Sequence, residues 1–127
     1  MDTGAPALTL DHVQVAAPPG AEAAARRFFG EVLGLVELPK PEVLARRGGC
    51  WFQLGGQQLH VGIEADFRAA KKAHVALRVA DPSALAGLRA RLVAVGAPIK
   101  EGDPLEGTAR FFTEDPWGNR LELLSGS

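Results

Sequence analysis

The chain has 127 residues, a length that suits one domain built around a continuous hydrophobic core. Its 14 Lys and Arg residues nearly balance its 15 Asp and Glu residues, and no apolar run is long enough to cross a bilayer, so we expect neither a nucleic-acid nor a membrane partner. The single cysteine, Cys50, excludes an intrachain disulfide, and residues 1–20 lack the pattern of a signal peptide, which favours a cytoplasmic protein.

The first half of the chain reads as a strand, a helix and a group of short strands. Residues 8–17 alternate between apolar and polar side chains, which predicts a strand with one apolar face. Residues 21–33 carry apolar side chains at helical spacing. Further strands are expected at residues 43–47, 50–54 and 57–64, because pairs of glycines separate these segments.

The second half repeats this order of elements. Residues 73–80 alternate again, and Asp81-Pro82 is a favourable helix start. The apolar stripe of this helix is expected to comprise Leu85, Leu88, Leu92 and Val95. The remaining strands are expected at residues 97–101, 108–114 and 120–124.

The two halves form an internal repeat with a shift of 62 positions, from His12 to His74. The same shift aligns Gly34 with Gly96, Gly56 with Gly118, Leu59 with Leu121, and His60 with Glu122. We therefore predict an α+β fold of two βαβββ modules, which form a curved mixed sheet cleft with the helices outside. Module one spans about 8–64 and module two about 73–125, within a single domain that covers residues 1–127.

Four polar side chains occupy equivalent places in the predicted modules. His12 and His74 lie on the opening strands, and His60 and Glu122 lie on the closing strands. Their strand neighbours are apolar and point toward the helices, so these four side chains emerge on the opposite face of each sheet. Imidazole and carboxylate groups suit a divalent Fe, Mn, Co, Ni or Zn ion. The four residues are therefore candidate metal ligands.

Three segments resemble the vicinal oxygen chelate superfamily, which contains glyoxalases, extradiol dioxygenases and bleomycin-resistance proteins. They are LDHVQVAA with the following RRFFGEVLGL, AHVALRV, and the closing DPWGNRLELL, and the similarity covers residues 8–125. The resemblance implies that His12, His74 and Glu122 bind a metal, with His60 at the position of a fourth ligand. Glyoxalase I enzymes commonly carry Glu at that position, so the histidine is a departure from their pattern. The resemblance also implies a homodimer.

Several functions fit this reading. We expect a metal-dependent enzyme of lyase or isomerase type that acts on a small oxygen-rich substrate, with Glu122 or a metal-bound water as the base. Gln14, Arg78 and Arg110 are candidate substrate-binding residues. The alternatives are an extradiol-type dioxygenase and a metal-free protein that binds a small molecule or drug, as bleomycin-resistance proteins do.

Overall fold

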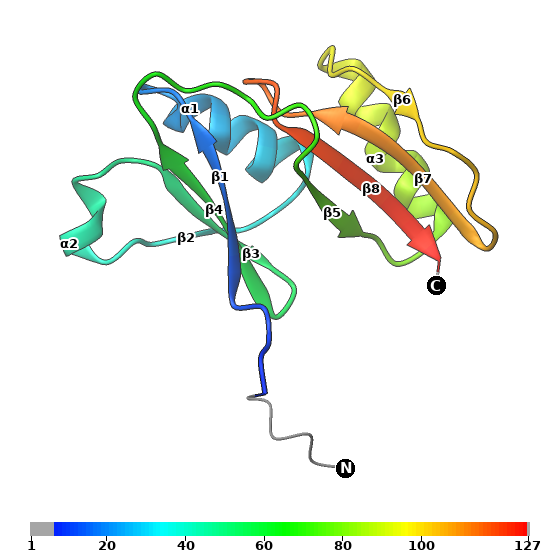
Figure 1. Cartoon of the computed structure of the whole chain (residues 1–127), viewed down its shortest axis with the longest axis horizontal. Helices are drawn as coiled ribbons and strands as arrows, with labels where there is room; N and C mark the ends of the chain where they lie inside the picture. Colours follow the sequence, from blue (N-terminus) through cyan, green and yellow to red (C-terminus); the bar gives the residue numbers. More distant parts are fainter. Residues whose placement is uncertain (1–6, 127) are drawn as a thin grey trace.

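The computed structural model describes residues 7–126 and contains two four-stranded sheets with equivalent strand orders (Figure 1). The first sheet has the order β1 (His12–Ala17), β4 (Gln57–Ile63), β3 (Cys50–Leu54) and β2 (Glu37–Leu38). The second has the order β5 (His74–Arg78), β8 (Arg120–Gly126), β7 (Thr108–Glu114) and β6 (Lys100–Glu101). In each sheet the first pair of strands is parallel and the others are antiparallel. The predicted pair of βαβββ modules is confirmed.

The strand register of the two modules is also equivalent. In the first sheet Gln14 lies opposite His60, and in the second Ala76 lies opposite Glu122. The shift of 62 positions that relates the sequences therefore relates the parallel strand pairs as well. It places His60 and Glu122 at the same position of their respective sheets.

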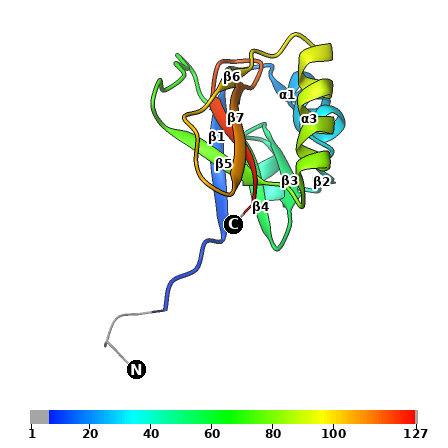
Figure 2. The same ribbon diagram turned by 90° about the vertical axis from the view of Figure 1, so that its right-hand side faces the viewer.

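The helix α1 (Glu22–Ala25), the π-helix η1 (Arg26–Val32) that continues it, and α3 (Pro82–Ala94) lie on one side of the sheets (Figure 2). The short α2 (Glu42–Ala45) lies apart from them, and its Leu44 lines a cavity together with His12 and His60. α3 begins as the sequence predicts, because the Asp81 carboxylate accepts a hydrogen bond of 2.8 Å from the backbone N–H of Ala84. Within residues 7–126, no helix has both the length and the apolar character that a membrane span requires.

One continuous core joins the modules. It includes Phe28, Phe29 and Phe52 from the first module and Leu88 and Leu92 from the second. The helix η1 packs against α3, and the Arg91 side chain on α3 donates a hydrogen bond of 2.9 Å to the carbonyl of Val32. The prediction that Val95 belongs to the buried stripe is wrong. Val95 is 55% exposed, because α3 ends at Ala94 and the chain turns away there.

The predicted strand at residues 43–47 is also wrong. This segment contains α2 and belongs to an arm, residues 39–49, that projects from the first sheet (Figure 1). Pro41 precedes the helix and Glu42 occupies its first turn, both of which favour a helix start over a strand. The arm ends at Gly49, which has a φ of 88° and lies so close to the carbonyl of Val61 that no side chain fits. The outer strand of this sheet is the short β2 instead.

A closed turn between β7 and β8 connects the modules a second time. The Asp115 carboxylate accepts hydrogen bonds from the backbone N–H groups of Trp117 and Asn119, at 3.0 and 2.8 Å, and from the Asn119 side chain at 2.7 Å. The same Asn119 amide also donates to the carbonyl of Ala16 in β1, at 2.7 Å. Burial raises the pKa of the Asp115 carboxyl, although these donors act in the opposite direction. The turn therefore fixes the start of β8 against module one.

Candidate metal centre

The first module contributes a column of three stacked rings. Trp51 on β3 lies directly opposite His60 on β4, with ring centroids 4.2 Å apart and planes 6° from parallel. His12 on β1 covers the other face of His60 at 4.3 Å. His60 is buried, at 6% exposure, whereas the His12 side chain is 46% exposed. The column therefore presents His12 to solvent and keeps His60 inside.

The nitrogen atoms of the two stacked histidines have different partners. His12 Nδ1 lies 2.8 Å from the Asp11 carboxylate, which only accepts hydrogen bonds, so Nδ1 carries the proton and Nε2 remains available. His60 Nε2 lies 2.8 Å from Oε1 of Gln58. Burial, followed by the neighbouring His12 and Lys40, lowers the pKa of His60 and favours its neutral form.

The second module contributes a histidine and a carboxylate in direct contact. His74 opens β5, and its Nδ1 donates to the backbone carbonyl of Lys72 at 3.1 Å. His74 Nε2 then faces Oε1 of Glu122, also at 3.1 Å. The Glu122 side chain is 11% exposed and that of His74 is 31% exposed. This pair is thus partly shielded from solvent.

Arg110 and Phe112 complete the surroundings of Glu122. The Arg110 guanidinium lies 3.3 Å from Oε2 of Glu122, and it also donates two hydrogen bonds to the backbone carbonyl of Asp103, at 3.1 and 3.0 Å. Phe112 lies opposite Glu122 in the sheet, and its ring forms a T-shaped pair with the His74 ring, with centroids 5.5 Å apart. Arg110 thus orients the carboxylate while Phe112 supports the imidazole.

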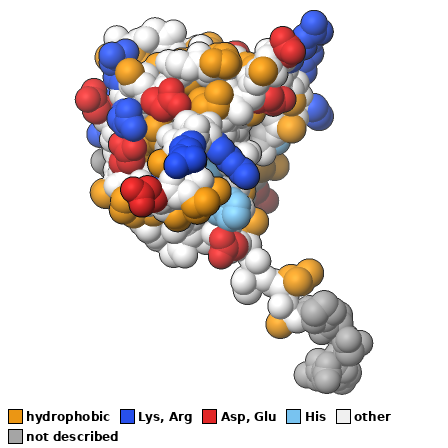
Figure 3. All heavy atoms as spheres, turned by 90° about the vertical axis from the view of Figure 1, so that its left-hand side faces the viewer, with side chains coloured by type: hydrophobic (Ala, Val, Ile, Leu, Met, Phe, Trp, Pro, Cys, Tyr) orange, Lys and Arg blue, Asp and Glu red, His pale blue; other side chains and the backbone are white. Residues whose placement is uncertain are grey.

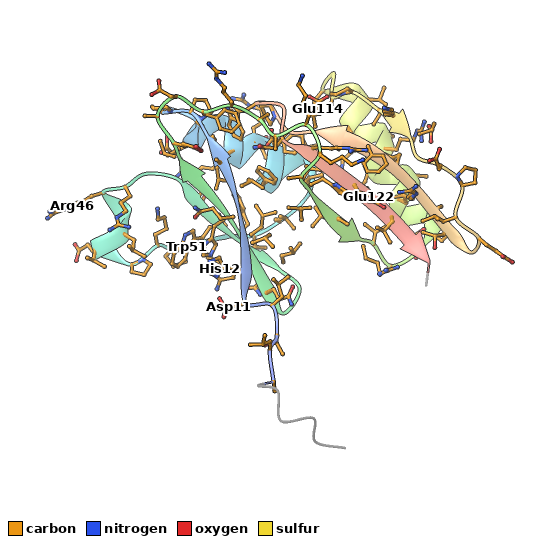
Figure 4. All side chains as sticks on the ribbon, in the orientation of Figure 1. Asp11, His12, Arg46, Trp51, Glu114 and Glu122 are labelled. Carbon is orange, nitrogen blue, oxygen red and sulfur yellow. The ribbon has the colours of Figure 1, made fainter. Side chains whose placement is uncertain are left out.

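The predicted metal ligands therefore form two half-sites, His12 with His60 and His74 with Glu122. Within residues 7–126, no three His, Cys, Asp or Glu side chains are grouped closely enough to hold a metal ion. Figure 4 shows the reason, since His12 and Glu122 extend from different sheets that stand side by side. The structure unites each pair but does not bring the two pairs together within one chain.

The other candidate substrate-binding residues lie on the same faces. The Gln14 side-chain amide lies against Gly62, so closely that a side chain at position 62 would displace it. Gln14 also lines a cavity of about 660 Å³ together with His12 and His60. Arg78 donates a hydrogen bond to the carbonyl of Gly126 at the far end of the second sheet. Both positions are consistent with the predicted alternation of the strands.

Basic side chains from the arm surround the first half-site. Lys40 and Arg47 line the same cavity, together with Asp11. Figure 3 shows this face, with Lys and Arg side chains gathered next to an exposed histidine. Lys40 donates to the carbonyl of Gly48, and the Glu22 carboxylate accepts from the backbone of Gly49 at 2.8 Å. These bonds hold the base of the arm beside the ring column.

Sequence reasoning missed the groups that orient the candidate ligands. Asp11 was identifiable only as the neighbour of His12, and the Lys72 carbonyl carries no side-chain signal at all. Gln58 lies two positions before His60 and therefore on the same face of β4, a spacing that could have pointed to the contact.

Comparison with known proteins gives matches among solved structures. No protein-family model and no curated protein sequence matches the chain. A glyoxalase family protein from Bacillus anthracis is 41% identical over 97% of this chain and 98% of its own, with a TM-score of 0.87. Lactoylglutathione lyase from Agrobacterium tumefaciens is 21% identical over 96% of both chains, with a TM-score of 0.69.

A variant of the fosfomycin resistance protein FosX from Listeria monocytogenes, in complex with Mn(II) and 1S,2S-dihydroxypropylphosphonic acid, is 15% identical. The structural match covers 94% of this chain and 92% of the FosX chain, with a TM-score of 0.79. The repeated modules and these matches define a protein of the vicinal oxygen chelate superfamily. Within that superfamily, the chain belongs to the glyoxalase family.

Proposed function

We propose that the protein is a metal-dependent enzyme of lyase or isomerase type that acts on a small oxygen-rich substrate. His12, His74 and Glu122 would hold a divalent Fe, Mn, Co, Ni or Zn ion. FosX, which shares the fold, binds Mn(II) in one of its structures, and this supports a metal in the present chain.

The contact between His74 and Glu122 carries the proposal. The Lys72 carbonyl accepts a hydrogen bond, so the proton of a neutral His74 is on Nδ1 and Nε2 presents its electron pair. That electron pair faces a carboxylate oxygen at 3.1 Å, and two acceptors at this distance repel each other unless a cation lies between them. A second proton on the ring or a metal ion meets this need. The donor set thus fits a metal ligand pair.

The surrounding groups would prepare these ligands. Asp11 and the Lys72 carbonyl select the tautomer that leaves Nε2 free on His12 and His74, an arrangement typical of metal-binding histidines. Arg110 fixes the second oxygen of Glu122. When bound, a divalent metal supplies Lewis acidity toward adjacent oxygen atoms of a substrate. Glu122 would also be the base that takes a substrate proton, and this role stays a prediction.

His60 is also a candidate ligand, and in addition it positions His12. Its ring separates His12 from Trp51, so it fixes the plane of the His12 imidazole. Since Nε2 contacts Gln58, ligation by His60 would use Nδ1 or require Gln58 to move.

A second copy of the chain would complete the centre. Because His12 lies apart from His74 and Glu122 within one chain, we propose a homodimer in which His12 of one protomer meets the other two ligands on its partner. Such a dimer would have two equivalent centres, each built from one half-site of each protomer.

Metal content tests this proposal. Wild-type protein and the His74→Ala and His12→Ala variants are dialysed against Fe(II), Mn(II), Co(II), Ni(II) and Zn(II), and bound metal is measured. We expect about one ion per chain in the wild type and strong loss in both variants, because each removes one of three ligands.

Mixing the two variants separates a shared centre from a centre within one chain. A mixed dimer of His12→Ala and His74→Ala chains contains one centre with all three ligands, so unfolding and refolding the mixture should restore part of the metal binding. Recovery in the mixture but in neither variant alone would support the shared centre. No metal in any preparation would refute the metal mechanism and leave metal-free binding of a small molecule as the function to test.

The extradiol-type dioxygenase remains the alternative enzymatic reading. It requires Fe or Mn and consumption of O₂, so an oxygen electrode distinguishes it from a lyase or an isomerase once the metal is known.

A further inference from the structure

The guanidinium of Arg120 differs from those of its neighbours because it has no hydrogen-bond partner among residues 7–126. Arg120 opens β8 opposite His74, and its guanidinium lies over the ring of Phe112, 4.0 Å from the centroid. Among residues 7–126, it donates no hydrogen bond and makes no ion pair. By contrast, Arg110 bonds to Glu122 and to a carbonyl, and Arg78 bonds to the carbonyl of Gly126. Arg120 is thus the arginine of this face with free donors.

The free donors border a cavity. Arg120 and Phe112 line a space of about 620 Å³ together with Lys71, Lys72 and Lys100. Glu114 is the one carboxylate in this lining, and it makes no ion pair with another described residue. Cations therefore outnumber anions around the space. A site of this kind attracts an anion, and a planar guanidinium stacked on a ring can bind two oxygen atoms of one anionic group at once.

The cavity and the candidate metal centre share a boundary. The Phe112 ring contacts Arg120 on its face and forms a T-shaped pair with His74, and Phe112 lies opposite Glu122 in the sheet. Lys72 lines the cavity with its side chain while its carbonyl holds His74. The cavity at Arg120 therefore lies next to the His74–Glu122 pair, with Phe112 and Lys72 common to both.

We propose that Arg120 binds an anionic group of the substrate, a phosphate, phosphonate or carboxylate, while the oxygen-rich part of the substrate lies at the His74–Glu122 pair. For the oxygen-rich part of the substrate this inference rests on the proposed function, whereas for the anionic group it rests on Arg120 alone. It assigns to Arg120 the recognition that the sequence suggested for Arg78 and Arg110, whose donors have protein partners.

Calorimetric titration with three small polyols tests the assignment. The probes are glycerol 3-phosphate, glycerate and glycerol, which share hydroxyl oxygens but differ in charge. They are titrated into wild-type protein and into Arg120→Gln, with Mn(II) and without it. Arg27→Gln is the matched control, because it removes the same charge from an exposed position on η1, on the helical side of the sheets.

We expect at least one anionic probe to bind the wild type more tightly than glycerol. Arg120→Gln should weaken that binding by roughly tenfold to a hundredfold, the usual effect of a charged hydrogen-bond donor. Arg120→Lys should recover only part of it, since an ammonium lacks the planar fork. Arg120→Gln should not alter glycerol binding, and Arg27→Gln should bind all three probes as the wild type does. The better of the two anions then identifies the group as phosphate-like or carboxylate.

Equal binding of all three probes, or equal binding of the anions by wild type and Arg120→Gln, would overturn the assignment. Metal content, measured on the same preparations, is a separate readout. Protein that binds no Mn(II) would contradict the proposed function, yet its titrations without metal would still show whether Arg120 binds the anion. Full Mn(II) binding with no effect of Arg120→Gln would contradict the inference alone.

Discussion

Burial between two stacked rings favours the neutral form of His60. Trp51 and His12 cover both faces of its imidazole, and only 6% of the residue is exposed. A charged imidazolium in this position would lose most of its hydration and lie against a second histidine. These two effects, burial first, lower its pKa below the ordinary value of 6.5. His60 is therefore the histidine of the ring column that is built to remain neutral.

Trp51→Ala should raise the pKa of His60 toward 6.5, because the substitution opens one face of the ring to water. An NMR titration of the histidine ring signals measures this, and His60→Gln identifies the signal. Because folding lowers this pKa, the stabilisation linked to neutral His60 is complete above pH 6.5 and is lost as the pH falls through the folded-state pKa. An unchanged pKa in Trp51→Ala would show that the stacked ring is not the source of the burial effect.

At the scale of elements, the turn between β7 and β8 has a role beyond reversing the chain. The Asn119 amide joins the Asp115 carboxylate to the carbonyl of Ala16, so one side chain connects the closing strand of module two with the opening strand of module one. These groups are partly or fully buried, where an unpaired carbonyl is costly. The turn thus positions β8, which carries both Arg120 and Glu122.

Asn119→Ala should lower the free energy of unfolding by about 1–3 kcal/mol, because it leaves the Ala16 carbonyl and one Asp115 oxygen without this donor. Chemical denaturation followed by circular dichroism measures the change. Glu106→Ala, at an exposed position in the connection before β7, is the control and should alter the value by less than about 0.5 kcal/mol. If both substitutions changed the free energy of unfolding by a similar, small amount, water would replace the Asn119 amide at no cost.

Elements with a strong period were predictable from the sequence. The alternation over residues 57–64 and 108–114 corresponds closely to β4 and β7, and the Asp81-Pro82 start of α3 is confirmed. The helix α2 in the arm was missed, since residues 43–47 are too few for their periodicity to distinguish a strand from a helix. The signals that favour a helix, Pro41 and Glu42, lie just before this segment.

The candidate site was predictable residue by residue but not in its spatial arrangement. Alternation placed His12, His60, His74 and Glu122 on the polar faces, and the structure keeps them there. The distance between the two half-sites depends on how the sheets pack, which is set by the helices η1 and α3 and their shared core. No local pattern in the chain encodes that distance.

At the scale of the whole molecule, the packing of the modules leaves each half-site open. The helices α1, η1 and α3 share one core on one side of the sheets (Figure 2). The polar faces of the two sheets, which carry His12 and Glu122, therefore lie away from these packed helices. If a second protomer completes the centre, metal binding and association are thermodynamically linked.

Mn(II) or another metal that the protein binds should therefore shift the equilibrium toward the dimer and raise the melting temperature, whereas a chelator should do the reverse. Sedimentation velocity over a range of protein concentrations measures the first effect and scanning calorimetry the second. Glu122→Gln, which weakens ligation but preserves shape, should lose most of the response. A metal that raised the melting temperature without altering association would indicate a centre held within one chain.

The equivalent register of the two modules has an evolutionary consequence. A duplicated unit starts with two identical positions on its closing strands, and here those positions hold an aromatic imidazole in one copy and a carboxylate in the other. Each copy can change its side chain without altering the backbone that displays it, because the strand pairing is the same in both. A change of one side chain therefore suffices to favour ring stacking in one copy and charge in the other, and either copy can change again without the other.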